Sequence, residues 1–168
     1  YISRNFAGNE VRALKEYEAN SDADVMKVLS DLVSDTQYQF GTRELLRSVT
    51  SRESSAYRYV FSQRRNGSTN DPNHGDELQY PFENLGALHR GRLRPFDKSD
   101  ERVSAAMAEA WANFVKTGNP NGSAVSQWAA YTPAFESYFE FGSRLATAPV
   151  KPSSRLDFIR DFYAKSNQ

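Results

Sequence analysis

The sequence contains no cysteine, so it has neither disulfide bonds nor thiolate ligands for a metal. It has no excess of either charge, because 21 Lys and Arg residues balance 21 Asp and Glu residues. This balance gives no electrostatic attraction to nucleic acid or to an anionic membrane. No apolar run approaches the ~20 residues that a membrane-spanning helix needs. We therefore expect neither nucleic acid nor a membrane as partner.

Aromatic residues make up 13% of the chain, which is too many for a disordered segment. The length of 168 residues is enough for one domain with a core of its own. The mean hydropathy of −0.71 is nevertheless polar for a self-contained core. This mismatch suggests that residues outside the chain supply part of the core.

The first third of the sequence predicts three helices. The first begins at Asn9 or Glu10, the second is capped by Ser21 and Asp22, and the third covers residues 38–49. Helical spacing predicts their inward residues, which are Val11, Leu14 and Tyr17, then Val25, Val28, Leu29, Leu32 and Val33, then Leu45, Leu46 and Val49.

Residues 55–62 are rich in aromatic and β-branched side chains and predict the strongest strand. Apolar residues on both of its faces are typical of a strand inside a parallel sheet. The chain offers one further short strand, at 138–141, to pair with it. We therefore expect strand 55–62 to be an edge of the sheet or to pair with polypeptide outside these 168 residues.

A polar loop is predicted at residues 63–73. A further helix is predicted to begin later, at Ser99. Ser99, Asp100 and Glu101 fill its first turn, where negative charge suits the helix dipole. Its predicted stripe is Val103, Ala106, Met107, Ala110, Trp111, Phe114 and Val115, and Lys116, Gly118 and Pro120 end it. Pro152 and Ser153 open a final helix with Leu156, Ile159, Phe162 and Tyr163 inward. This order of elements is typical of the closing section of an α/β fold, mostly helical around a central strand.

His74 lies directly after the polar loop that leaves strand 55–62. In α/β sheets, sites form beyond the carboxyl ends of strands, and a histidine there is suited to acid–base work near neutral pH. A surface histidine is the alternative, and position alone favours it. The same choice applies to Glu77, which is either a solvated carboxylate or a hydrogen-bonded support of the loop.

Several segments carry a family resemblance. His74-Gly75-Asp76-Glu77-Leu78 with Tyr80-Pro81-Phe82 is similar to the His-Gly-x-Glu-Leu-x-x-x-Phe segment of type-B carboxylesterases and cholinesterases. The segment from Trp111 to Asn121 closely resembles the Trp-Ala-x-Phe-Ala-Lys-Thr-Gly-x-Pro-Asn signature of the same family. Residues 56–61, Trp128-x-x-Tyr131 and residues 138–141 agree with that family in order and spacing.

The resemblance implies that residues 1–168 form the C-terminal section of one α/β-hydrolase domain. In that family a serine, a glutamate and a histidine form the catalytic triad, and His74 takes the place of the histidine. Glu77 would support the loop that carries it. The implied substrate is a small carboxylic ester, hydrolysed through an acyl-serine intermediate without metal or organic cofactor.

The serine of such a triad stands on a Gly-x-Ser-x-Gly elbow, and this sequence has none. Gly118 and Gly122 have the spacing, but Pro120 occupies the place of the serine. Asp71 and Asp76 are too close to His74 in sequence to replace the triad acid, and Ser68 lies in the loop itself. We expect the missing N-terminal section, in the same chain or a separate one, to supply nucleophile and oxyanion hole, and the chain alone to be inactive.

Two other classes of function stay open at this point. One is a cholinesterase-like adhesion module without catalysis, against which the retained His74 argues. The other is a helical interaction domain, against which the strand at 55–62 and the segment at Trp111 argue. His89, Arg64 and Arg65 are interpreted as surface residues, and Trp111 and Phe114 as core.

Overall fold

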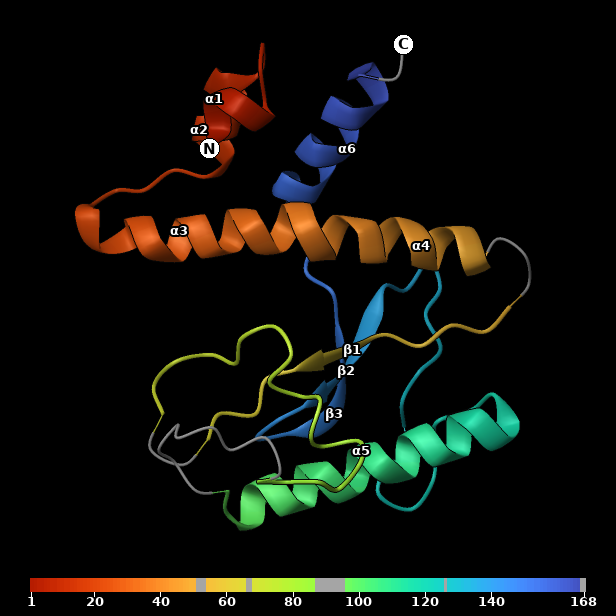
Figure 1. Ribbon diagram of the computed structural model, residues 1–168. Helices are drawn as coiled ribbons and strands as arrows, with labels where there is room; N and C mark the ends of the chain where they lie inside the picture. The colour runs from red at the N-terminus through yellow and green to blue at the C-terminus, as the bar shows by residue number, and fades with distance from the viewer. Residues whose placement is uncertain (51–53, 66–67, 87–95, 126, 167–168) are drawn as a thin grey trace. The chain divides into compact units, whose positions relative to one another are not determined.

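The computed structural model describes residues 1–50, 54–65, 68–86, 96–125 and 127–166 (Figure 1). The chain divides into two compact units. Tyr1–Ser48 and Lys151–Gln168 form the helical unit, and Val49–Val150 form the sheet unit. The expectation for His89 lies outside the described residues.

The helical unit contains the elements predicted near both ends of the sequence. The long helix drawn in orange in Figure 1 consists of three parts without a break, because a π-helical turn joins two α-helices. The elements of this unit are α1 (Ile2–Asn5), α2 (Glu10–Glu16), α3 (Asp22–Ser34), the π-helical turn η1 (Asp35–Gln39), α4 (Phe40–Thr50) and α6 (Ser154–Ser166). The three predicted N-terminal helices and the final helix are confirmed, and α1 is an addition.

The core of the helical unit differs from the predicted inward faces. Its buried residues are Phe6, Ala13, Tyr17, Leu32, Leu156, Phe158 and Ile159. On α2 the buried side runs through Ala13 and Tyr17, so that Val11 is 85% exposed and Leu14 is also exposed. Val25, Leu29, Leu45 and Tyr163 are exposed as well, contrary to prediction. Helical spacing locates an apolar face, but the neighbours present in the unit decide which part of it is covered.

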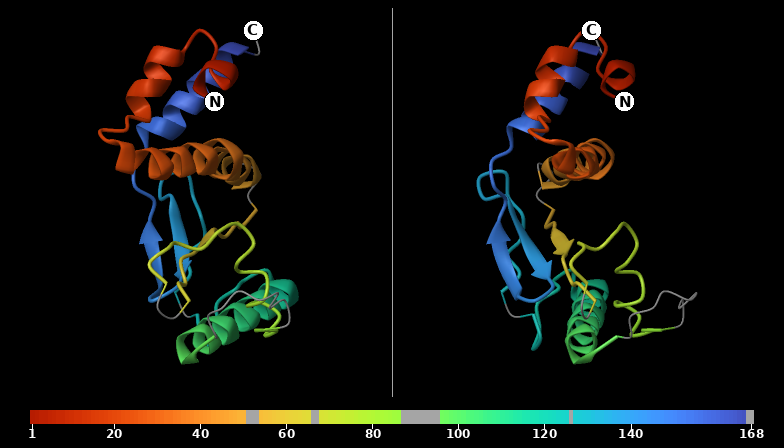
Figure 2. Two further views of the ribbon diagram at one scale, coloured as in Figure 1. Left: turned by 60° about the vertical axis from the view of Figure 1, so that its left-hand side comes forward. Right: turned by 90° about the vertical axis from the view of Figure 1, so that its left-hand side faces the viewer.

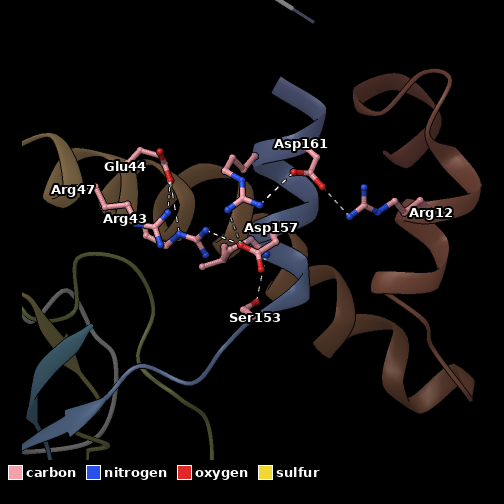
Figure 3. Close-up of polar contacts among 9 residues, drawn as sticks. Arg12, Arg43, Glu44, Arg47, Ser153, Asp157 and Asp161 are labelled. Atoms are coloured by element: carbon pink, nitrogen blue, oxygen red, sulfur yellow. Dashed lines mark hydrogen bonds and ion pairs between the residues drawn. The ribbon is translucent and has the colours of Figure 1, made fainter. Parts of the chain in front are cut away.

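Ion pairs join α6 to the other helices of this unit (Figure 3). Arg43 of α4 is buried and donates to Asp157 at 2.8 Å. Arg12 of α2 donates to Asp161 at 3.1 Å, and Arg160 contacts both carboxylates. These bonds fix α6 against α2 and α4 in addition to the apolar core.

Among the described residues of the sheet unit, three strands form one sheet in the order β1-β2-β3. These are β1 (Tyr59–Phe61), β2 (Ser137–Phe141) and β3 (Leu145–Pro149). β1 pairs parallel with β2, and β2 pairs antiparallel with β3. β1 is shorter than the predicted strand 55–62. β3 was not predicted, because its Ala and Pro residues have low strand propensity.

β1 is an edge of this sheet, as predicted. Within the described part of the chain it pairs with β2 on one side and is the last strand in the order. Its three residues are half-buried rather than enclosed on both faces. The parallel pairing of β1 with β2 supports assignment to a mixed α/β fold.

Helix α5 (Lys98–Thr117) packs with the sheet to form the core of this unit (Figures 1 and 2). The buried cluster contains Tyr80, Val103, Ala106, Met107, Ala110, Val125, Trp128, Phe139 and Phe141. The first four predicted residues of the α5 stripe are therefore buried. The stripe then ends, because Trp111 is half-buried, Phe114 is exposed and Val115 is 83% exposed.

Candidate functional site

The loop that carries His74 begins directly beyond the carboxyl end of β1. It returns toward α5 through a series of turns that starts at His74, drawn in yellow-green in Figure 1. Gly75 has φ +88°, a left-handed conformation that suits glycine. The side chain of Asp76 accepts a hydrogen bond of 2.8 Å from the backbone N–H of Asn73. These local bonds turn the chain sharply at His74, whose side chain is exposed.

Arg64 and Arg65, which precede the turn at His74, both contact other side chains. Arg64 donates to Asp71 through Nε at 3.0 Å and through Nη2, which closes the polar part of the loop. The guanidinium of Arg65 lies 4.5 Å from the ring centroid of Phe96. Both Arg64 and Asp71 are exposed, so this pair contributes about 0–1 kcal/mol. Arg64 is thus exposed, as predicted for a surface residue, whereas Arg65 is half-buried.

A buried carboxylate joins the two ends of the histidine loop. Asp100, in the first turn of α5, is fully buried. Its Oδ1 accepts hydrogen bonds from Gln63 Nε2 at 3.0 Å and from the Tyr80 hydroxyl at 2.8 Å. Its Oδ2 accepts from the backbone N–H of Asp97 at 2.9 Å. Gln63 opens the loop and Tyr80 closes it, so one carboxylate holds both ends.

Tyr80 is fixed on two sides by α5. Its carbonyl oxygen accepts a hydrogen bond of 2.8 Å from Ser104 Oγ, in addition to the bond from its hydroxyl to Asp100. Burial raises the pKa of the Tyr80 phenol, and the bond to Asp100 raises it further. The phenol therefore stays a neutral donor across the physiological pH range.

Sequence reasoning assigned Asp100 to the helix dipole and missed its contact with the loop. Asp97 is the N-cap of α5, and its side chain accepts from the backbone N–H groups of Ser99 and Asp100. Asp97 and Asp100 thus form a reciprocal capping box, for which the three-residue spacing is the available signal. No signal in the sequence indicated that the same carboxylate reaches Gln63 and Tyr80.

Glu77 lies within the turns after His74 and is half-buried. Burial raises the pKa of the Tyr59 phenol, and the nearby negative charge of Glu77 adds to this effect. The backbone carbonyl of Glu77 accepts from the N–H of Tyr80 at 2.9 Å. Of the apolar residues that follow Glu77, Tyr80 is buried, whereas Leu78 is exposed and Phe82 is 78% exposed.

A hollow of about 280 Å³ lies beside the loop. Most of the residues that line it are polar, and the lining consists of Phe61, Gln63, Arg64, Arg65, Ser68, Asn70, Asp71, Pro72, Asn73, Asp76 and Tyr80. Acyl chains bind in apolar pockets, so this hollow has the wrong lining for one.

The Gly-x-Pro-x-Gly segment has a structural explanation. Gly118 ends α5 with φ +74°, as a left-handed helix cap. A Cβ at Gly122 would collide with the side chains of Glu109 and Asn113. These glycines therefore shape the return from α5. Among the described residues, no helix is long and apolar enough to cross a membrane and no acidic or histidine cluster is suited to a metal.

Residues 4–158 match the profile of the Carboxylesterase family. Fumonisin B1 esterase of Sphingopyxis macrogoltabida is 30% identical over 164 residues, which cover 91% of this chain and 29% of that protein. Human bile salt-activated lipase is 39% identical over 90 residues, or 52% of this chain and 11% of that protein.

The fold is similar to that of a solved carboxylesterase of Geobacillus stearothermophilus. The TM-score is 0.72 at 20% identity, over 96% of this chain and 33% of that one. The chain thus spans about a third or less of the length of these proteins.

Proposed function

Because this chain belongs to the carboxylesterase family, we propose that it supplies the triad histidine, His74, to a carboxylic-ester hydrolase. The observation that carries the proposal is the position of His74 in a sharp turn beyond the carboxyl end of β1. That position suits a group that must reach a nucleophile on other polypeptide. We call the protein formed by this chain and the polypeptide with that nucleophile the complete enzyme.

In the proposed reaction, His74 accepts the proton of the serine hydroxyl as the serine oxygen attacks the ester carbonyl. The tetrahedral intermediate expels the alcohol, whose oxygen receives the proton from His74. Water then attacks the carbonyl of the acyl-serine as His74 accepts a proton from it. The bond to the serine oxygen breaks, the carboxylic acid leaves, and His74 returns the proton to the serine. The substrate class is a small carboxylic ester, and this chain's own part in each step is to move one proton.

Glu77 has a supporting role in this proposal. Its half-burial between the exposed His74 and the buried Tyr80 suits a group that holds the loop by hydrogen bonds. The triad acid and the serine lie on polypeptide outside these 168 residues. We therefore propose that residues 1–168 are the C-terminal section of one hydrolase domain.

Exposed apolar side chains support the need for that further polypeptide. In the sheet unit these include Leu78, Phe82, Phe114 and Val115, and in the helical unit Val11, Leu14 and Met26. Contiguous apolar surface is ordinarily covered by a partner or by the rest of a domain, and Phe114 and Val115 are adjacent in α5. The free edge of β1 supports the same conclusion.

The test compares the isolated chain with the complete enzyme. p-Nitrophenyl butyrate and a serine-directed phosphonate serve as substrate and label. We expect turnover and stoichiometric labelling from the complete enzyme and neither from the isolated chain. Turnover by the isolated chain above a His74→Ala control would contradict the division of the triad. A complete enzyme without turnover or labelling would favour the adhesion alternative.

A further inference from the structure

We infer that Asp100, acting through Tyr80, is a positioning residue that fixes His74 for catalysis. The inference rests on the proposed role of His74. Asp100 does not touch the substrate in this account. It holds the loop on which the proposed base stands.

The argument begins with the closure of the loop. In the sequence, His74 lies between Gln63 and Tyr80. The side chains of Gln63 and Tyr80 both donate to the same oxygen, Asp100 Oδ1. One buried atom therefore fixes both ends of the segment that carries His74. A long flexible loop without such a clamp samples many end-to-end arrangements, and closing it has an entropic cost.

The clamp is rigid because every part of it is buried and bonded. Asp100 is 0% exposed, and Tyr80 is 1% exposed. The bonds from Gln63, Tyr80 and Asp97 to the Asp100 carboxyl group measure 3.0, 2.8 and 2.9 Å. The Asp97 N–H fixes Oδ2, so the carboxylate cannot rotate without breaking the helix cap. The ring of Phe61 in β1 lies 4.7 Å from that of Tyr80, centroid to centroid, which ties the clamp to the sheet.

The chemistry explains why such a clamp affects the rate. A general base works when it lies within about 3 Å of the proton that it accepts. A displacement of about 1 Å at a catalytic group can lower the rate on the order of 100-fold. His74 itself is exposed, and the loop that carries it is held at Gln63 and Tyr80. The bonds at the two ends of the loop therefore help to set the position of the His74 ring.

The experiment uses Tyr80→Phe in the complete enzyme, because this change removes one hydroxyl and keeps the ring in the core. We expect kcat for p-nitrophenyl butyrate to fall about tenfold or more, with KM changed less than twofold. Asp100→Asn replaces one of the two acceptor oxygens with an amide nitrogen and is expected to lower kcat further. Glu109→Ala is the matched control, because it removes hydrogen bonds that the same helix accepts from Ser123 and Ala124 but touches no residue of the clamp. We expect it to lower the melting temperature with kcat unchanged.

A double-mutant cycle separates positioning from general damage to the fold. If Tyr80 acts through His74, Tyr80→Phe causes no further loss in the His74→Ala background. Equal losses in both backgrounds overturn the inference, and so does wild-type kcat in Tyr80→Phe. These results leave the proposed function intact if His74→Ala is inactive. If His74→Ala keeps full activity, both proposals fall. Tyr80→Phe also keeps the test decisive if Asp100→Asn does not fold.

Discussion

The hydroxyl of Tyr17 donates a hydrogen bond of 3.0 Å to Asp35, the first residue of the π-helical turn between α3 and α4. Burial raises the pKa of Asp35, and this effect outweighs the bond from Tyr17 and the charge of Arg155. Arg155 also lies over the Tyr17 ring, 4.8 Å from its centroid. The π-helical turn therefore places an acid where its charged form is disfavoured.

The first prediction follows from the direction of this shift. An acid whose folded-state pKa is raised stabilises the fold below its unfolded pKa, and loses this contribution as pH rises through the folded pKa. Asp35→Asn cannot ionise and still offers an oxygen to Tyr17. We expect its melting temperature, relative to the wild type, to increase from pH 4 to pH 8.

Asp31→Asn is the control with the opposite sign. Burial alone raises the pKa of Asp31, but hydrogen bonds from Lys27 and Arg155 lower it overall. Its contribution is therefore present above the unfolded pKa and lost in acid. We expect Asp31→Asn to be less stable than the wild type from pH 8 down to about pH 4, with the difference narrowing as the pH falls further toward about 2. If the melting temperatures of the two variants, relative to the wild type, changed with pH in the same way, the opposite pKa shifts of Asp35 and Asp31 would be contradicted.

A second prediction concerns the buried ion pair of the helical unit. Arg43→Ala leaves Asp157 without its 2.8 Å donor and empties a buried site on α4. We expect the free energy of unfolding to fall by about 1–3 kcal/mol, measured by urea denaturation of the complete enzyme. Lys27→Ala removes an exposed pair with Asp31 and should cost at most about 0.5 kcal/mol. If Arg43→Ala and Lys27→Ala lowered the free energy of unfolding equally, the burial of Arg43 would add nothing to stability.

A third prediction tests the turn at His74. Gly75→Ala forces a side chain into the left-handed region at φ +88°, at a cost of about 1–2 kcal/mol. We expect the turn to relax, with kcat of the complete enzyme reduced and the melting temperature lowered. Gly41→Ala in α4 meets no atom within 4 Å and should raise stability by about 0.5–1 kcal/mol. An unaltered kcat in Gly75→Ala would mean that this turn does not orient His74.

A fourth prediction separates support from catalysis at Glu77. Glu77→Gln keeps the size of this half-buried side chain and removes its charge. We expect a smaller loss of kcat than in His74→Ala and a larger loss in melting temperature. If Glu77→Gln lowered kcat as much as His74→Ala without a change in melting, Glu77 would have to be assigned as the triad acid.

Local patterns predicted much of this fold. α5 and α6 follow their apolar spacing and end signals, and Gly118 caps α5 as expected. β3 was missed because its stability comes from pairing with β2, which a propensity argument does not include. Val11 and Val115 were predicted to be buried because spacing identifies an apolar face without identifying what covers it.

Some residues of the candidate site were likewise predicted from the sequence, and others were not. His74 and Glu77 were found through a family resemblance, whereas Asp100 was not recognised as part of the site. Its contacts with Gln63 and Tyr80 join residues 37 and 20 positions apart. Such long-range bonds depend on the three-dimensional path of the loop and have no periodic signature in the sequence.

The most direct measurement of the central claim is kcat of the complete enzyme with His74→Ala, using p-nitrophenyl butyrate. If His74 is the triad base, kcat falls by about 10⁴- to 10⁶-fold, as expected for residues that act as a unit, and KM changes little. The melting temperature should stay near that of the wild type, because His74 is exposed. A fall in kcat of less than tenfold would show that His74 is not the base.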